Sequence, residues 1–166
     1  AVDAVVVAIP AAAVPPVVAQ AGERGCGGAV VLSAGFGEIE AGRELEVALR
    51  EAALTHDLPV CGPNGNGIVA ARARAAMWGD SVAPLEPGSV AMVTQSGNVG
   101  VNALGSQRGI RWHTVVSTGN QAVCDASDWL AALAGLDDVR SVALFLEADG
   151  DGAPLAVALA GCAERD

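Results

Sequence analysis

The stretch from Ser89 to Asn98, Ser-Val-Ala-Met-Val-Thr-Gln-Ser-Gly-Asn, contains the change of pattern that indicates the fold. Its apolar part is typical of a buried strand, and its polar turn leads into an Ala/Val/Leu-rich helical segment that ends near Arg108. A strand, a tight turn and a helix in this order direct free backbone N–H groups and the positive end of the helix dipole at an anion. Ser96 adds a hydroxyl donor, and Gly97 lets the backbone approach a ligand closely. This stretch alone fits either a phosphate site or an ordinary strand-to-helix turn with a serine N-cap.

The composition favours a layered α/β protein. Of the 166 residues 52% are hydrophobic and only 3% are aromatic, so alanine, valine and glycine must supply most of the core. Valine-rich runs without polar alternation are typical of parallel strands that are buried on both faces. The formal net charge of −10 argues against nucleic acid as a partner, because a nucleic-acid-binding protein needs a basic face.

The four cysteines and the apolar N-terminal run bear on compartment and ligands. The cysteines are scattered, form no Cys-x-x-Cys pair and have only two histidines to assist them, so we expect no bound metal and a reducing compartment. Prolines interrupt the N-terminal run, which has no basic start and is too short for a membrane span. We therefore expect a cytoplasmic protein without membrane contact. The chain begins without Met, directly in a strand pattern, and this predicts a fragment.

Strands and helices alternate along the chain, which predicts parallel sheets with right-handed crossovers. The predicted strands span residues 2–9, 29–32, 58–61, 90–94, 113–117 and 142–146. The predicted helices span residues 14–24, 38–55, 98–108 and 126–134. We predict an α/β fold of two Rossmann-like or flavodoxin-like parallel-sheet units, both incomplete: residues 1–70 and residues 89–166, joined by a connector over 71–88. Polar loops follow the strands at the carboxyl end, where such sheets bind ligands.

These loops resemble, in order, motifs of the NDP-forming acyl-CoA synthetases, the superfamily of the succinyl-CoA synthetase α subunit. The matching pieces are Ala8-Ile9-Pro10-Ala11, Ser33-Ala34-Gly35-Phe36, Gly62-Pro63-Asn64, Gln95-Ser96-Gly97, Ser117-Thr118-Gly119-Asn120 with Asp125, and Glu147 at a strand end. Each piece is short, but the set covers nearly the whole chain in family order. The family commonly has Cys after Gly-Pro-Asn, where this chain has Gly65, so the surroundings of the CoA thiol differ from the family pattern.

The resemblance implies a CoA-binding domain followed by a flavodoxin-like ligase domain. It implies CoA contacts in the loops after the first three strands, at Pro10, Ser33, Gly35 and Asn64. It also implies that a helix N-terminus holds the phosphate of a phosphohistidine; the further cofactor-binding residues are Gln95, Ser96, Gly97, Asn98 and Asn120. Glu147 is the implied catalytic residue, since a family glutamate at such a position orients the histidine.

The reaction implied by the resemblance makes acyl-CoA in steps. ATP phosphorylates a histidine, the phosphoryl group passes to a small carboxylic acid, and the CoA thiol displaces it. The cofactors are therefore CoA and ATP or ADP, the nucleotide being bound mainly by segments outside this chain. The implied partners are the carboxylic acid, an ATP-grasp domain or subunit, and further copies in an oligomer. The family histidine lies beyond Asp166, and His56 and His113 are interpreted as structural, so we expect the chain alone to be inactive.

Other interpretations stay open on the sequence. The protein could be a CoA- or nucleotide-binding module with a regulatory role and no catalysis. It could also be a nicotinamide-dependent oxidoreductase, because Gly65-Asn-Gly-Ile-Val-Ala70 has the GxGxxA form of a dinucleotide fingerprint and follows a strand. For Asp125, an N-cap of the following helix is the structural alternative to a role in the site.

Overall fold

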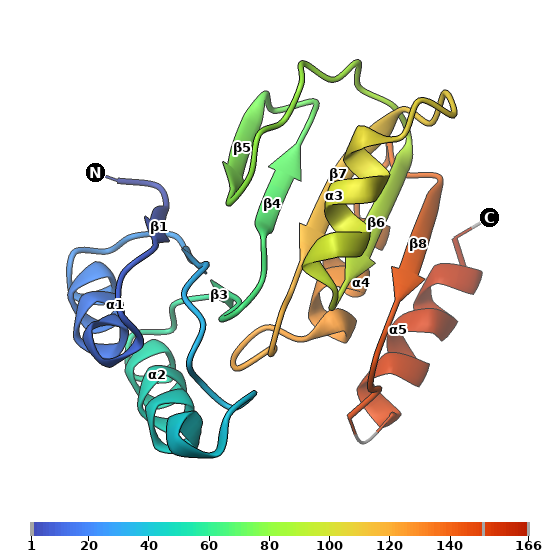
Figure 1. The fold of residues 1–166 in the computed structure, drawn as a ribbon. Coiled ribbons are helices and arrows are strands. Elements are labelled where there is room, and N and C mark those ends of the chain that lie inside the picture. The colour runs from blue at the N-terminus through green and yellow to red at the C-terminus, as the bar shows by residue number, and fades with distance from the viewer. Residues whose placement is uncertain (1, 151, 166) are drawn as a thin grey trace.

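The computed structural model describes residues 2–150 and 152–165 and contains two α/β units side by side (Figure 1). The first unit is a three-stranded parallel sheet in the order β1-β2-β3. Its strands are β1 (Val5–Val7), β2 (Ala29–Val31) and β3 (Val60–Cys61). Its helices are α1 (Val14–Glu23) and α2 (Arg43–Thr55), preceded by the 3-10 turns η1 (Ala11–Ala13) and η2 (Glu40–Gly42).

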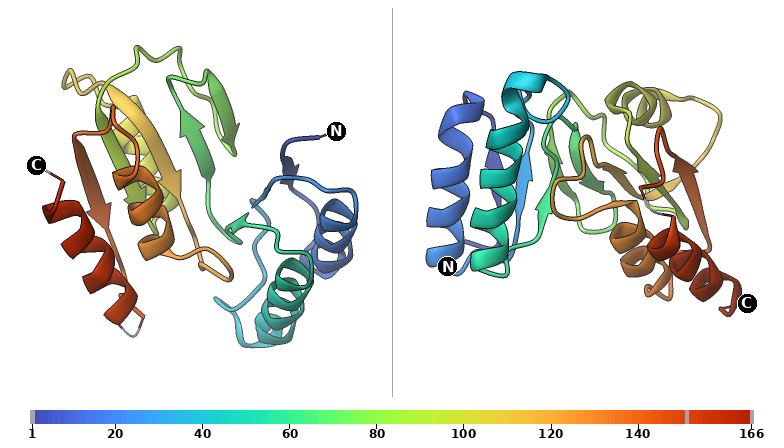
Figure 2. Two further views of the ribbon diagram at one scale, coloured as in Figure 1. Left: turned by 180° about the vertical axis from the view of Figure 1, so that it is seen from behind. Right: turned by 90° about the horizontal axis from the view of Figure 1, so that it is seen from below.

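Both helices of the first unit cover the same face of its sheet, the one that points away from the second unit (Figure 2). Val14 and Val18 of α1 and Leu49 of α2 are fully buried in the core of this unit, as their helical spacing requires. On the opposite face, Val30 packs with Val116 of the second unit. A shared apolar cluster therefore joins the two units.

The second unit is a five-stranded mixed sheet in the order β5-β4-β7-β6-β8. Its strands are β4 (Gly67–Ala70), β5 (Ala75–Trp78), β6 (Val90–Thr94), β7 (Trp112–Ser117) and β8 (Ser141–Phe145). Its helices are α3 (Gly97–Gly105), α4 (Ala126–Ala134) and α5 (Ala153–Ala163). α3 covers one face, and α4 and α5 cover the other (Figure 2). Because β6 is parallel to both β7 and β8, the carboxyl ends of these three strands meet at one edge.

The expectation of parallel sheets is confirmed for the first sheet and for β6, β7 and β8, but it is wrong for the rest of the second sheet. β4 and β5 form an antiparallel hairpin, and β4 also pairs antiparallel with β7. The hairpin includes residues that the sequence suggested for the connector over 71–88. Its sequence is rich in alanine and arginine and lacks the alternating apolar pattern of a half-buried strand, so no local signal indicated it.

The same hairpin removes the basis of the oxidoreductase alternative. A GxGxxA fingerprint needs its glycines at the turn into a helix, whose N-terminus then holds the pyrophosphate. Residues Gly67–Ala70 are instead strand β4, and the described residues 71–74 form a turn into β5 rather than a helix. The GxGxxA match therefore does not mark a dinucleotide-binding turn.

The remaining predicted elements lie close to their expected bounds. The bounds of β6 and α4 agree with the prediction, while α2 begins at Arg43 rather than Glu38. α5 was not predicted, because its sequence is apolar on all sides and shows no helical stripe. In the part of the chain that the structure describes, no helix is long and apolar enough to cross a membrane.

The four cysteines are free. Cys61 is buried in β3, and this burial raises the pKa of its thiol to about 12. Burial also raises the pKa of the half-buried Cys124. Both thiols are thus neutral at physiological pH and pack as small apolar groups.

Candidate functional site

A polar hollow of about 430 Å³ lies where loops of the two units meet. Its lining residues are Glu38, Asn64, Asn66, Gln95, Ser96, Gly97, Asn98, Gly119, Asn120 and Glu147. The set includes every predicted site residue except Pro10, Ser33 and Gly35. The predicted phosphate site and Glu147 therefore share one hollow, as the parallel order of β6 and β8 requires.

The N-terminus of α3 opens into this hollow with unsatisfied donors. Among the residues that the structure describes, none accepts a hydrogen bond from the N–H groups of Gly97, Asn98 or Val99. The Ser96 hydroxyl makes no capping bond to the helix, although Ser96 occupies the N-cap position. Free N–H groups at the positive end of a helix dipole form an anion site. The serine-cap alternative is therefore not observed, and the phosphate site stays a prediction.

Gln95 holds the loop after β8 beside this helix end. Its Oε1 accepts from the N–H groups of Glu147 at 2.5 Å and Ala148 at 2.9 Å, and its Nε2 donates to the carbonyl of Ala148 at 2.7 Å. The backbone N–H of Gln95 also donates to the carbonyl of Phe145. The side-chain amide of Gln95 is thereby committed to positioning the Glu147 loop.

The glycines of two loops let the units approach closely at the hollow. A methyl group on Gly65 would lie 2.5 Å from the carbonyl oxygen of Ser117, and one on Gly119 would lie 2.1 Å from that of Pro63. Contacts between real Cβ atoms and backbone atoms are not this short, so both positions need glycine. The N–H of Asn120 then reaches the carbonyl of Pro63 at 2.9 Å.

The three predicted CoA residues outside the hollow lie in the first-unit loops. Pro10 precedes η1, after β1. The Ser33 hydroxyl donates to the carbonyl of Ile9 at 2.6 Å and accepts from its N–H at 3.0 Å, so it ties together the loops after β1 and β2. Gly35 has a φ of +102°, which favours glycine, and its Cβ position faces Ala11.

Glu38 is a site residue that the sequence reasoning missed. Its carboxylate accepts hydrogen bonds from the N–H groups of Gly35 and Phe36 and from Nδ2 of Asn120. Partial burial acts to raise the pKa of Glu38, but the bonds from Gly35 and Asn120 outweigh it and hold the pKa below its ordinary value. Glu38 is therefore ionised at neutral pH, on the first-unit side of the hollow.

The hollow has two carboxylates, from Glu38 and Glu147, and none of its described lining residues is an arginine or a histidine. An anion bound here would be stabilised only by N–H groups and the helix dipole among the described lining residues, against the repulsion of two negative charges. A cationic or proton-donating group from elsewhere would remove that conflict. Within the described residues, no group of three or more His, Cys, Asp or Glu side chains is arranged to hold a metal ion.

Both histidines of the chain have local partners away from the hollow. His113 is buried in β7, where Nδ1 lies 2.9 Å from Thr114 Oγ1 and Nε2 lies 3.1 Å from Asp138 Oδ1. Asp138 is also paired with Arg72 at 2.6 Å. His56 follows α2 as its C-cap and packs against Gly22 of α1.

Asp125 has the structural role that its sequence position allowed. Its Oδ1 accepts from the N–H groups of Ser127 at 2.8 Å and Asp128 at 3.1 Å, while Asp128 Oδ2 accepts from the N–H of Asp125 at 2.9 Å. This reciprocal pair is a capping box that starts α4.

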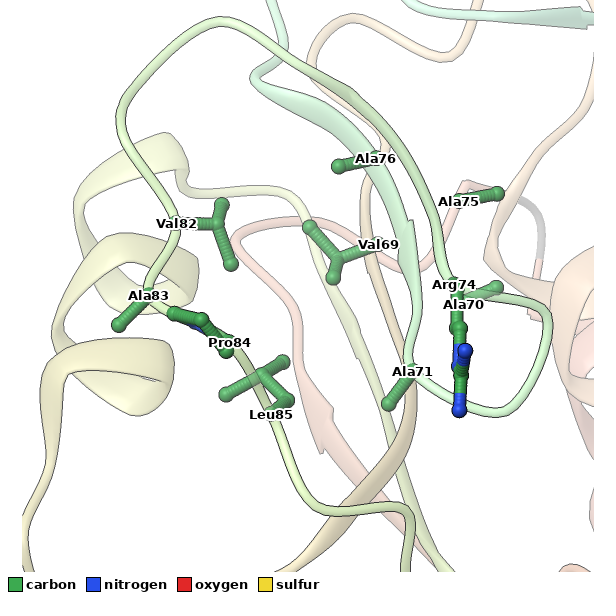
Figure 3. A pocket seen from close by; sticks show the side chains of 10 residues that line it. All are labelled: Val69, Ala70, Ala71, Arg74, Ala75, Ala76, Val82, Ala83, Pro84 and Leu85. Atoms are coloured by element: carbon green, nitrogen blue, oxygen red, sulfur yellow. The ribbon is translucent and has the colours of Figure 1, made fainter.

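A second hollow of about 470 Å³ lies between the β4–β5 hairpin and residues 82–85 (Figure 3). Its lining is aliphatic apart from Arg74. It borders the end of β4 that pairs with Thr114, at the start of β7, and so lies at the opposite edge of the sheet from Ser117. Its described lining contains no predicted site residue, and the polar hollow is the candidate site.

Comparisons with known proteins show which proteins the chain is similar to. Residues 87–166 match the family described as the succinyl-CoA ligase like flavodoxin domain. Over 91% of its length, the chain is 33% identical to the α subunit of an ADP-forming acetate–CoA ligase of Pyrococcus furiosus, and 36% identical to an ADP-forming acetate–CoA ligase of Archaeoglobus fulgidus. The chain belongs to the succinyl-CoA-ligase-like NDP-forming acyl-CoA synthetases. It spans 33% and 22% of the lengths of these two relatives.

Solved structures of similar proteins share the fold of this chain. The protein PH0766 of Pyrococcus horikoshii is 27% identical with a TM-score of 0.91; the match covers 99% of this chain and 38% of that one. The dinucleotide-forming acetyl-coenzyme A synthetase 1 of Ca. Korarchaeum cryptofilum, solved with phosphate and ADP, is 29% identical with a TM-score of 0.87. That match covers 99% of this chain and 36% of the other. The relation between the two units is therefore shared with these proteins.

Proposed function

We propose that this chain provides the phosphate site and part of the CoA site of an acid–CoA ligase. The complete reaction forms acyl-CoA from a carboxylic acid, CoA and ATP through a phosphohistidine and an acyl phosphate. The phosphoryl group moves from ATP to the histidine and from there to the carboxylate, and the CoA sulfur then displaces it as phosphate. The histidine is supplied by a segment outside this chain, and the chain alone is inactive.

The observation that supports this proposal most strongly is the pairing of free N–H groups with a carboxylate in one hollow. Phosphoryl transfer depends mainly on positioning and on stabilising charge. Ser96, Gly97 and Asn98 are placed to donate to phosphate oxygens. Glu147 is placed to accept a hydrogen bond from an incoming imidazole and so to fix its tautomer. An imidazole between the phosphate and the carboxylate would relieve the repulsion described above.

The proposed CoA contacts in the first-unit loops do not depend on free hydrogen-bond donors. The N–H groups of Gly35 and Phe36 already donate to Glu38, and the Ser33 hydroxyl is bonded to Ile9. We therefore assign Pro10, Ser33, Gly35 and Asn64 to close van der Waals contact with CoA. No step of the reaction is attributed to their hydrogen bonds.

The partners follow from the same proposal. The substrate is a small carboxylic acid, and ATP or ADP is bound by an ATP-grasp domain or subunit outside this chain. The relatives support this, since their names describe ADP-forming ligases for acetate and, in Nitrosopumilus maritimus, for 4-hydroxybutyrate. We also propose that the complete enzyme is an oligomer and works in the cytoplasm, and that its first domain ends before β4, which pairs with β7 of the second unit, rather than at residue 70.

Radiolabelled ATP tests the proposal in the complete enzyme, with the histidine and nucleotide segments present. Glu147→Gln should strongly reduce phosphoenzyme formation and leave CoA affinity nearly unchanged. Ser96→Ala should weaken the phosphorylated state by about 1–3 kcal/mol, the value of one charge-assisted hydrogen bond. Normal phosphorylation of Glu147→Gln would overturn the assigned role. CoA binding without any phosphoenzyme in the unaltered protein would favour the non-catalytic module.

A further inference from the structure

Asn120 joins the two units with its whole side-chain amide. Its Nδ2 donates to Glu38 Oε2 at 2.6 Å and to Glu46 Oε2 at 2.8 Å, and both glutamates belong to the first unit. Its Oδ1 accepts from Asn64 Nδ2 at 3.2 Å. These four residues, Glu38, Glu46, Asn64 and Asn120, are called the clasp. An amide nitrogen can face two carboxylates whereas an amide oxygen cannot, so the neighbours dictate the orientation of Asn120.

The carboxylates of the clasp also organise the loop of residues 33–37. Gly35 and Phe36 donate their N–H groups to Glu38, and Gly37 donates to Glu46 Oε2 at 3.0 Å. This loop is therefore folded around two negative charges of its own unit. The N–H groups of Gly35, Phe36 and Gly37, in the loop where the family resemblance implies CoA contacts, are thereby satisfied internally.

We propose that Asn120 is a positioning residue that holds the loop of residues 33–37 against the hollow. It does so by giving both carboxylates a neutral donor from the second unit. Glu38 lies on the first-unit side of the hollow and Asn120 reaches it from the second unit, while Gln95 fixes the loop of Glu147. The clasp thus fixes the loop of residues 33–37 beside the hollow. The proposal rests on the observed contacts, and it stands or falls independently of the ligase reaction.

The neutrality of residue 120 is the feature that can be tested. Asn120→Asp is nearly isosteric but turns a shared donor into a third negative charge beside Glu38 and Glu46. A like charge at this distance is repulsive, so the clasp should open. Asn102→Asp is the matched control, because Asn102 is an exposed residue of α3 whose side chain bonds only to the carbonyl of Asn98.

Amide hydrogen exchange followed by mass spectrometry measures the opening directly. In Asn120→Asp, the peptide covering residues 33–39 should exchange at least about tenfold faster than in the unaltered chain, since exchange reports local unfolding. The peptide covering residues 126–134 should be unchanged in both variants, and Asn102→Asp should leave residues 33–39 unchanged. Equal exchange of residues 33–39 in Asn120→Asp and in the unaltered chain would overturn the proposal.

A second substitution separates positioning from general destabilisation. Adding Glu38→Gln to Asn120→Asp removes one charge and lets the new amide donate to the new carboxylate. The exchange rate of residues 33–39 should then fall part of the way back toward that of the unaltered chain. A role in overall stability predicts instead that the double variant exchanges faster than Asn120→Asp alone. If Asn120→Asp does not fold, Asn120→Ser decides, because it shortens the donor and adds no charge. Faster exchange in Asn120→Ser at residues 33–39 but not at residues 126–134 supports the proposal. Unchanged exchange at residues 33–39 overturns it.

Discussion

The side-chain amide of Gln95 forms hydrogen bonds through both its oxygen and its nitrogen to the main chain at Glu147 and Ala148. The oxygen accepts from two successive N–H groups, of Glu147 and Ala148, and the nitrogen donates to the carbonyl of Ala148. The turn residue that precedes α3 therefore also sets the position of the proposed catalytic carboxylate. The sequence suggested Gln95 as a ligand contact, and the geometry adds a role in holding Glu147.

Replacing Gln95 tests how much these hydrogen bonds stabilise the fold. Gln95→Ala removes three hydrogen bonds at an exposed loop, and we expect a loss of about 1–2 kcal/mol in the free energy of unfolding. Urea unfolding followed by circular dichroism measures the change. Gln107→Ala, at an exposed position in the loop after α3, is the control and should have little effect. Equal stability of the two variants would show that the hydrogen bonds of Gln95 contribute nothing to the free energy of unfolding.

The contact between the loops of residues 62–67 and 117–120 predicts a contrast between two glycines. Gly65→Ala would place a methyl group 2.5 Å from the Ser117 carbonyl oxygen, and the backbone shift should cost about 1–3 kcal/mol. Gly105→Ala has nothing within 4 Å and lies in α3, so it should stabilise the chain by about 0.5–1 kcal/mol. Thermal unfolding of both variants distinguishes them, and a neutral Gly65→Ala would mean that the loops are not in contact.

The lowered pKa of Glu38 predicts how its contribution to stability depends on pH. The folded state favours the charged form, so this contribution is fully present above the ordinary value of 4.5 and is lost as the pH falls through the lower folded-state pKa. The stability difference between the unaltered chain and Glu38→Gln should therefore shrink in acid. Urea midpoints at pH 7 and at about pH 3 measure it, with Glu40→Gln as the matched control. A difference that grows toward acid would contradict the assignment.

The sequence predicted the parts of the site that depend on local patterns. The strand β6, the turn with Ser96 and Gly97, and the start of α3 lie within a dozen residues, so a change of periodicity marks them. The capping box of Asp125 and Asp128 is local for the same reason. These features follow from hydrogen bonds between near neighbours, which a sequence pattern can indicate.

Other parts depend on partners that are far apart in the chain. Asn120 lies 82 residues from Glu38 and 74 from Glu46, and no local pattern connects them. The only hint at Glu38 was an acid directly after the glycines at 35 and 37, whose N–H groups need an acceptor. The β4–β5 hairpin is another such case, because β4 is held by pairing with β7 rather than by its own residues.

The most direct test of the phosphate site is a titration of the ¹⁵N-labelled chain with phosphoimidazole, followed by amide chemical shifts. The account predicts saturable shifts at Gly97, Asn98 and Val99, whose N–H groups are free, and larger shifts than with inorganic phosphate, because the imidazole separates the phosphate from Glu147. It predicts no comparable shifts at Gly35 and Phe36, which donate to Glu38. Shifts that are absent at the start of α3, or that appear at residues 35 and 36 instead, would contradict the account.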